Sequence, residues 1–214
     1  MLQSALANNA LETAKTIGRK VDKEVLSRSR KYQNSNFDVQ TNSTVTGKSA
    51  GVMLYSLSST TRASAEDAKR AKDIVEKANN SGRLNEVVIT SSNLMKAGVS
   101  ATEAKELETA YKINEASRKQ ALRDDVMTGF GNNGGEEYIS YLMTGESMMM
   151  QGGNDWKKWY DKMEKTLLKI QNKDGSWNGH HCITSPVFCT ATCLLILSIN
   201  KDMQFSMNQN SSSF

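Results

Sequence analysis

The sequence predicts an all-α fold made of helical hairpins. Only one proline, Pro186, occurs in 214 residues, and the 14 glycines gather in a few clusters. Between these breaks, apolar residues recur three and four positions apart, which is the spacing of an amphipathic helix. A β-sandwich would instead need turn signals at intervals of about 8–12 residues. The sequence therefore favours helices.

The expected helices form four pairs followed by a single helix. In chain order they span 2–17, 22–33, 48–60, 64–79, 84–97, 101–127, 136–150, 155–171 and 186–199. In each pair the first helix is the more apolar and the second the more charged, which suits an inner ring of helices surrounded by an outer ring. The pairs recur at irregular intervals typical of helical-hairpin repeats, whose members must stack to bury their apolar faces.

Start and stop signals define the first two pairs. Gly18 separates the first two helices, and Asp22 is placed to cap the second. Residues 34–46 are rich in Asn, Ser and Thr and predict a loop. In the second pair, Ser64 is followed by two acidic residues, which predicts a new helix start with Ser64 as its N-cap.

The later helices carry similar signals. Gly98 ends the first helix of the third pair, and Ser100 begins a capping box for the second. A glycine-rich break at 129–135 precedes the fourth pair. Ser185 is the expected N-cap of the last helix, with Pro186 at its first position. This last helix is apolar almost all round, so we expect it to be buried on most sides.

Charge and hydropathy restrict the classes of partner. The net charge is +4 and charges of both signs mix along the helices, so we expect no nucleic-acid binding. The longest apolar run, from Cys193 to Leu197, is too short to span a membrane. The helix pattern begins directly at Met1, and we therefore expect upstream sequence, and with it a possible export signal, to be missing. The compartment stays open.

Residues 165–177 carry the most specific motif. Gln171 stands at an expected helix end, where its amide can satisfy unpaired backbone groups. Asp174 and Gly175 predict a tight turn, in which glycine permits a positive φ. Trp177 then supplies a large apolar surface that can pack back on the helix.

This motif resembles the repeat, named for its glutamine and tryptophan, of terpene cyclases and protein prenyltransferases. The resemblance to this prenyltransferase/squalene-oxidase repeat family is specific over 155–199 and fainter over 2–150. It implies an α/α toroid over residues 1–200, forming an incomplete ring of about four and a half hairpins. Residues 201–214 are polar, and we expect them to form a disordered tail.

The resemblance leaves two classes of function open. Triterpene cyclases of this family protonate substrate with an Asp-x-Asp-Asp motif, and protein prenyltransferases bind zinc through Asp-x-Cys and a later His; neither pattern occurs here. We therefore expect a non-catalytic domain that binds a small or lipid-like ligand or a partner protein. The alternative is a toroid enzyme, similar to a prenyltransferase, terpene cyclase or polysaccharide lyase, that uses the central cavity.

A carboxylate pair is the candidate for acid–base chemistry. Glu136 and Glu137 follow two glycines at an expected helix start, and such a pair could act as acid and base in a cavity. Tyr138 and His181 are further candidate catalytic residues. The simpler alternative is that both glutamates stabilise the positive end of the helix.

All histidines and cysteines of the chain lie between positions 180 and 193, and they are His180, His181, Cys182, Cys189 and Cys193. The three thiols and one histidine could form a tetrahedral zinc site, and apart from this possible zinc we expect no cofactor. Cys182 and Cys189 could instead form a disulfide in an exported protein. The third alternative is a set of buried free thiols.

A methionine-rich run offers a candidate ligand surface. Met143 and residues 148–150 could line a pocket that accepts a lipid-like molecule. Flexible methionines also commonly fill irregular gaps in a core.

Overall fold

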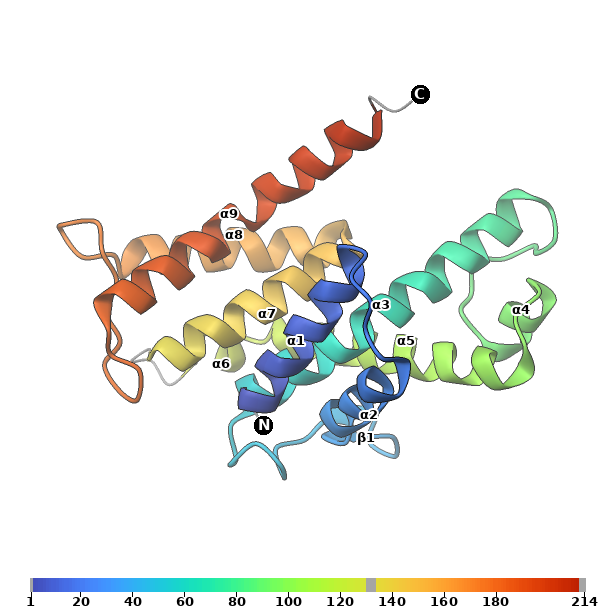
Figure 1. Cartoon of the computed structure of the whole chain (residues 1–214), viewed down its shortest axis with the longest axis horizontal. Helices are drawn as coiled ribbons and strands as arrows, with labels where there is room; N and C mark the ends of the chain where they lie inside the picture. Colours follow the sequence, from blue (N-terminus) through green and yellow to red (C-terminus); the bar gives the residue numbers. More distant parts are fainter. Residues whose placement is uncertain (1, 130–133, 212–214) are drawn as a thin grey trace.

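The protein is an all-α structure organised around one long central helix. The computed structural model describes residues 2–129 and 134–211. The elements are α1 (Leu2–Thr16), α2 (Lys23–Asn34), β1 (Phe37–Asp38), β2 (Ser43–Thr44), α3 (Met53–Asn80), α4 (Ser91–Lys96), α5 (Ala101–Ala121), α6 (Asp124–Met127), α7 (Gly135–Gln151), α8 (Gly153–Lys169) and α9 (Pro186–Ser211). Helix α3 packs against α1, α2, α5 and α7, and α7 in turn packs against α9. Figure 1 shows an elongated molecule with α7, α8 and α9 towards one end and α4 at the other.

Two hydrophobic clusters share helix α3. The central cluster joins the start of α3 to α7, α8 and α9, and consists of Leu54, Leu57, Val126, Met127, Tyr138, Tyr141, Met148, Trp156, Trp159, Met163, Leu167, Trp177, Cys189, Cys193, Ile196 and Ile199. The distal cluster joins the end of α3 to α4 and α5, and consists of Ala71, Val75, Ala78, Leu84, Leu94, Ala104 and Leu107. Burial of apolar surface in these clusters is the main driving force for folding.

The predicted break before Ser64 is wrong. The segments expected at 48–60 and 64–79 form the single helix α3, which begins only at Met53. Ser64 is buried in the middle of this helix, where its hydroxyl donates a hydrogen bond of 2.6 Å to the carbonyl oxygen of Thr60. A serine hydroxyl can be satisfied in this way inside a helix as well as at a cap. Because α3 contains neither glycine nor proline, nothing interrupts it.

The third pair is also divided differently from the prediction. Only α4 is helical within the segment expected at 84–97, and Thr90 caps it by accepting a hydrogen bond from the N–H of Asn93. The three β-branched residues before Thr90 disfavour an earlier start. The segment expected at 101–127 is split into α5 and α6.

Three predicted N-caps are confirmed, and one of them is Ser185, whose hydroxyl accepts a hydrogen bond of 3.4 Å from the N–H of Phe188. The Asp22 carboxylate accepts hydrogen bonds from two first-turn N–H groups of α2, and the Ser100 hydroxyl accepts one from Glu103 at the start of α5. Gly98, at the expected helix end, has a φ of +100°.

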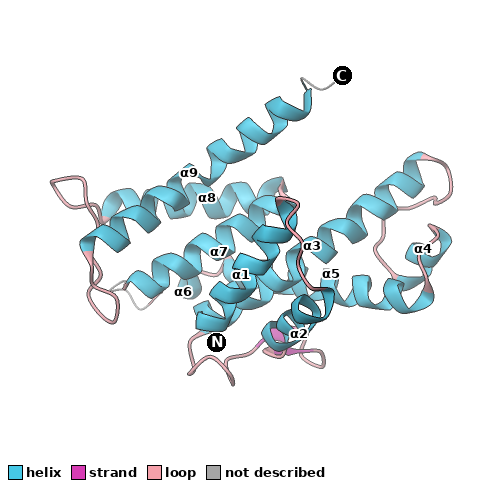
Figure 2. Ribbon diagram, in the orientation of Figure 1, coloured by secondary structure: helices cyan, strands magenta, loops and turns pink. Residues whose placement is uncertain are grey.

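The loop predicted at 34–46 contains a small antiparallel hairpin, shown between α2 and α3 in Figure 2. Phe37 pairs with Thr44 in this hairpin. The N–H of Thr44 donates a hydrogen bond of 2.7 Å to the side-chain oxygen of Gln120, which fastens the hairpin to α5.

Helix α9 is longer than expected. Its backbone continues to Ser211, so the helix end predicted at 199 is too early. No glycine or proline follows Pro186, and therefore no strong stop signal ends the helix sooner. Residues 201–211 have helical backbone and 212–214 lie outside the described residues, so the disorder expected over 201–214 stays a prediction.

Candidate functional site

Two consecutive glutamates open helix α7 and are buried. Glu136 is 5% exposed and Glu137 is 0% exposed. The Oε2 of Glu137 accepts a hydrogen bond of 2.7 Å from the N–H of Gly134, the N-cap residue. Carboxylates are favourable here because they satisfy free N–H groups and face the positive end of the helix dipole. Glu137 therefore acts as a capping residue of α7.

The imidazole of His181 lies between the two carboxylates. Its Nδ1 is 2.9 Å from Oε1 of Glu136, and its Nε2 is 3.5 Å from Oε2 of Glu137. The backbone fixes this arrangement, because the N–H of Ile183 donates to Glu136 and the N–H of Gly135 donates to the carbonyl of Ile183. The loop between α8 and α9 is thus fastened to the start of α7.

Cys182 places a thiol beside this carboxylate–imidazole pair. The residue is exposed and has a φ of +49°, a left-handed conformation that is uncommon outside glycine. A hydrogen bond to the Glu136 carboxylate raises the pKa of the thiol. Burial acts to raise the pKa of Glu136, but hydrogen bonds from Cys182, from backbone N–H groups and from His181 outweigh burial and lower it. Glu136 therefore carries a negative charge next to the thiol and the imidazole.

Glycine is required where the loop meets α7. A Cβ atom on Gly134 would lie 2.6 Å from the carbonyl oxygen of His181 and 2.8 Å from its Nδ1. A Cβ atom on Gly179 would collide with the carbonyl oxygen of Ile183. The close approach of these two segments depends on the absence of side chains at both glycines.

The tyrosines near the glutamates bond to the backbone. The hydroxyl of Tyr138 donates to the carbonyl of Asn178, and that of Tyr141 donates to the carbonyl of Met127, each at 3.3 Å. Burial raises the pKa of Tyr141. Both rings belong to the central cluster, so these hydroxyls join segments of the fold.

The three predicted sulfur ligands differ in burial. All three cysteines lie among the described residues and are free thiols. Cys189 and Cys193 are buried in the central cluster, whereas Cys182 lies at the surface. The residues whose ligand atoms come together are Glu136, His181 and Cys182, with these atoms within 4.8 Å of one another. His180, Cys189 and Cys193 lie outside this group, and the disulfide between Cys182 and Cys189 is not formed.

The glutamine–tryptophan motif forms a tight turn after α8. The Gln171 amide donates a hydrogen bond of 2.8 Å to the carbonyl of Gly175, whose φ is +86°. The carboxylate of Asp174 accepts hydrogen bonds from the N–H and the hydroxyl of Ser176. Trp177 is buried, and its indole N–H donates to the carbonyl of Leu167. The motif therefore closes the end of α8.

A largely apolar pocket of about 230 Å³ lies between α1, α3, α7 and α9. It is lined by Thr13, Thr16, Ile17, Arg62, Leu142, Glu146, Met149, Met150, Leu195, Ser198 and Ile199. Two members of the methionine-rich run thus line a pocket, while Met143 and Met148 are buried.

Arg62 contributes a buried positive charge to the lining of this pocket. The residue is only 5% exposed, and its Nε donates a hydrogen bond of 2.5 Å to the side-chain oxygen of Asn9. One terminal nitrogen lies 4.0 Å from the sulfur of Met150. Burial lowers the pKa of Arg62, yet an arginine stays charged in proteins. The guanidinium forms no ion pair with a carboxylate of the described residues, since none lies within 4.0 Å.

Sequence reasoning missed Arg62 because it fell in the turn expected before Ser64. The available signal was its isolation, because it is the only charged residue between Lys48 and Glu66.

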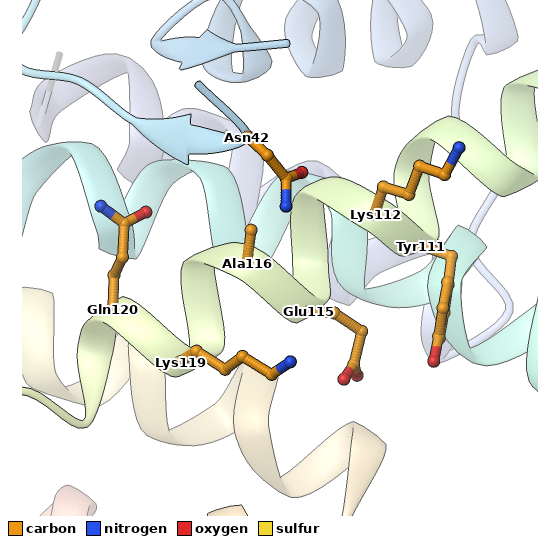
Figure 3. Close-up of a pocket in the computed structure, with 7 residues that line it drawn as sticks. All are labelled: Asn42, Tyr111, Lys112, Glu115, Ala116, Lys119 and Gln120. Carbon is orange, nitrogen blue, oxygen red and sulfur yellow. The ribbon is translucent and has the colours of Figure 1, made fainter. Parts of the chain in front are cut away.

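A second pocket, of about 400 Å³, lies on the outer surface of α5. Figure 3 shows Lys112, Glu115 and Lys119 along this helix, with the side chain of Asn42 pointing towards it from the β1–β2 turn. None of the residues that line it is buried. This pocket therefore resembles an ordinary solvated helix face.

Comparison of the chain with protein-family models, with curated proteins and with solved structures finds no match. Within the described ranges, no helix combines the length and the hydropathy that crossing a membrane requires.

Proposed function

We propose that this chain is a helical binding domain that holds a small amphipathic molecule with an anionic head group. The molecule occupies the pocket between α1, α3, α7 and α9, with its apolar part against Met149, Leu195 and Ile199. Its head group accepts hydrogen bonds from Arg62. The observation that carries this proposal is the buried guanidinium of Arg62, which lines a largely apolar pocket and has no carboxylate within ion-pair distance among the described residues.

Charge and volume support this class of ligand. A buried charge without an ion-pair partner is costly, and an anionic ligand would reduce that cost by contacting the guanidinium directly. The other charged residue of the pocket, Glu146, attracts the guanidinium electrostatically and also has a further interaction. A pocket of about 230 Å³ suits a short alkyl chain and not a triterpene.

The repeat motif supports a relationship to helical-hairpin toroids. The turn built by Gln171, Gly175 and Trp177 has the features that the prenyltransferase/squalene-oxidase repeat implies. We therefore propose that the binding domain is related to this toroid class. The lack of the two catalytic signatures supports a binding role within it.

The geometry supports the enzyme alternative less well. Catalysis by Glu136 and Glu137 would need carboxylates that a substrate can reach, but they are 5% and 0% exposed. Glu137 is also occupied with capping α7. The remaining candidates, Tyr138 and His181, contact the backbone or these same carboxylates.

The test compares octanoate with octanol, which share a chain and differ in the head group. Binding is measured by calorimetry and by the rise in melting temperature that a ligand of the folded state produces. We expect octanoate to bind and octanol to bind more weakly. Arg62→Met should weaken octanoate binding by about ten- to 100-fold, because a hydrogen bond to a charged group is lost.

Arg70→Met is the matched control. Arg70 lies on the same helix but is exposed and paired with Glu103, so octanoate affinity should not change. Arg62→Lys, which keeps the charge, should retain part of the binding. Equal affinity of wild type and Arg62→Met for octanoate, or no difference between the two ligands, would contradict the proposal.

A further inference from the structure

Three residues from two distant segments present different metal-ligating atoms to one point. Glu136 begins α7, and His181 and Cys182 lie in the loop before α9. Their carboxylate oxygen, imidazole nitrogen and sulfur lie within 4.8 Å of one another. Ligand atoms bound tetrahedrally to one zinc ion lie roughly 3.3–3.8 Å apart, given the usual bond lengths. If these three atoms moved about 1 Å closer together, they would occupy three of the four ligand positions around a tetrahedral zinc ion.

The backbone holds these residues in place without a ligand. The N–H of Ile183 donates to the second oxygen of Glu136, and the carbonyl of Ile183 accepts from Gly135. The left-handed conformation of Cys182 lets its thiol lie near the same carboxylate as the preceding imidazole. His181 can lie here because Gly134 has no side chain; a Cβ atom on Gly134 would lie 2.8 Å from Nδ1 of the imidazole. Little conformational freedom remains to be lost on binding.

A second carboxylate lies behind the imidazole. Nε2 of His181 is 3.5 Å from Oε2 of Glu137, while Nδ1 faces Glu136. Histidines that bind metals commonly donate their other N–H to a carboxylate, which fixes the tautomer and increases the basicity of the ligand nitrogen. Glu137 is therefore a positioning residue, and Nδ1 is the atom left to bind an ion.

The donor set selects the class of ion. One thiolate, one imidazole and one carboxylate suit a borderline-soft divalent ion, whereas Mg²⁺ and Ca²⁺ require oxygen ligands. Because Cys182 is at the surface, water can reach the fourth position. We propose that Glu136, His181 and Cys182 bind one Zn²⁺ ion, with water as the fourth ligand. This site does not depend on the pocket at Arg62.

The experiment titrates the full, metal-free chain with Co²⁺, a spectroscopic substitute for zinc. We expect one ion per chain, an absorption band from sulfur-to-cobalt charge transfer, and displacement of Co²⁺ by Zn²⁺ but not by Mg²⁺. Cys182→Ser should remove the band and weaken Co²⁺ binding by at least about tenfold. Cys182 is exposed, so this variant should fold.

Two further variants separate the proposed site from its surroundings. His180→Gln changes the neighbouring exposed histidine, which lies outside the group, and should bind Co²⁺ as wild type does. Glu137→Gln should keep the band but weaken binding by about tenfold. The proposal is overturned if wild type binds no Co²⁺, if Cys182→Ser keeps the band, or if Mg²⁺ competes equally.

Discussion

The indole Nε1 of Trp177 donates a hydrogen bond of 2.9 Å to the carbonyl oxygen of Leu167. Leu167 lies in the last turn of α8, where its carbonyl also accepts a hydrogen bond of 3.2 Å from the N–H of Ile170. The tryptophan thus satisfies a helix end and fills the central cluster with the same side chain.

Trp177→Phe should therefore lower the free energy of unfolding by more than the loss of packing alone would. The extra cost should be about 1 kcal/mol, because one buried hydrogen bond is lost. Trp156→Phe is the matched control, since Trp156 is also in the central cluster and its ring stacks on Trp159. Urea unfolding of both variants measures the difference, and equal stabilities would contradict this role of the indole N–H.

Arg30 joins three carboxylates from two other helices. Its guanidinium lies 2.6 Å from Glu12 of α1 and 2.7 Å from both Glu66 and Asp67 of α3. Glu12 is 0% exposed, and its burial raises its pKa. Arg30→Met should lower the free energy of unfolding by about 3–5 kcal/mol, because a buried carboxylate loses its partner.

Arg70→Met provides the comparison for Arg30→Met, because the exposed pair of Arg70 with Glu103 should contribute less than about 1 kcal/mol. Adding Glu12→Met to Arg30→Met should recover part of the loss, since the unpaired charge is then removed. A loss below about 1 kcal/mol for Arg30→Met alone would show that Glu12 does not need this partner.

Gly145 allows α7 to approach two large side chains. A Cβ atom there would lie 2.7 Å from the Trp159 ring and 2.8 Å from Cδ1 of Ile199. Gly145→Ala should cost about 1–3 kcal/mol through overpacking, which exceeds the helix-propensity gain of about 1 kcal/mol. Thermal unfolding should show a lower melting temperature. Gly47→Ala is the control, because a Cβ atom at Gly47 meets nothing within 4 Å; a more stable Gly145→Ala would refute the packing argument.

Asp174 makes the turn after α8 sensitive to acid. Hydrogen bonds from the hydroxyl and N–H of Ser176 lower its pKa below the usual 3.8. A depressed folded-state pKa stabilises the fold above the unfolded pKa, and this contribution is lost as pH falls through the folded value. The stability difference between wild type and Asp174→Asn should thus be constant near neutral pH and shrink below about pH 3.8. A difference that does not change with pH down to full protonation would contradict this.

Helical periodicity was sufficient to predict the class of the fold, but not every helix boundary. The start and end of α1, α2, α7 and α8 lie within about two residues of the sequence prediction, and Asp22, Gly134 and Gly152 mark several of these ends. The prediction failed at Ser64, where the same residue type that caps a helix is instead satisfied by the carbonyl of Thr60. Local sequence does not distinguish these two states, since tertiary burial decides between them.

The sequence identified individual residues of the candidate sites, but not which of them lie together in the structure. Glu136 and His181 each stood out in the sequence, one as an acid and one as a metal ligand. Their contact joins positions 45 apart and depends on how the loop before α9 folds back on α7. Cys189 and Cys193 share a helix and are buried in the core, whereas Cys182 lies at the surface. Spacing along the chain cannot reveal such long-range placement.

Because α3 is one continuous helix, it couples the stabilities of the two hydrophobic clusters. Val75 belongs to the distal cluster, Leu57 to the central cluster, and Arg62 lies on the helix between them. Local opening of one cluster removes support from a helix that the other cluster also needs, so the clusters should exchange amide protons as coupled units. A ligand bound at Arg62 would then slow amide proton exchange at the α4 end as well. A partner bound to that end would increase the ligand affinity of the pocket by the same coupling free energy.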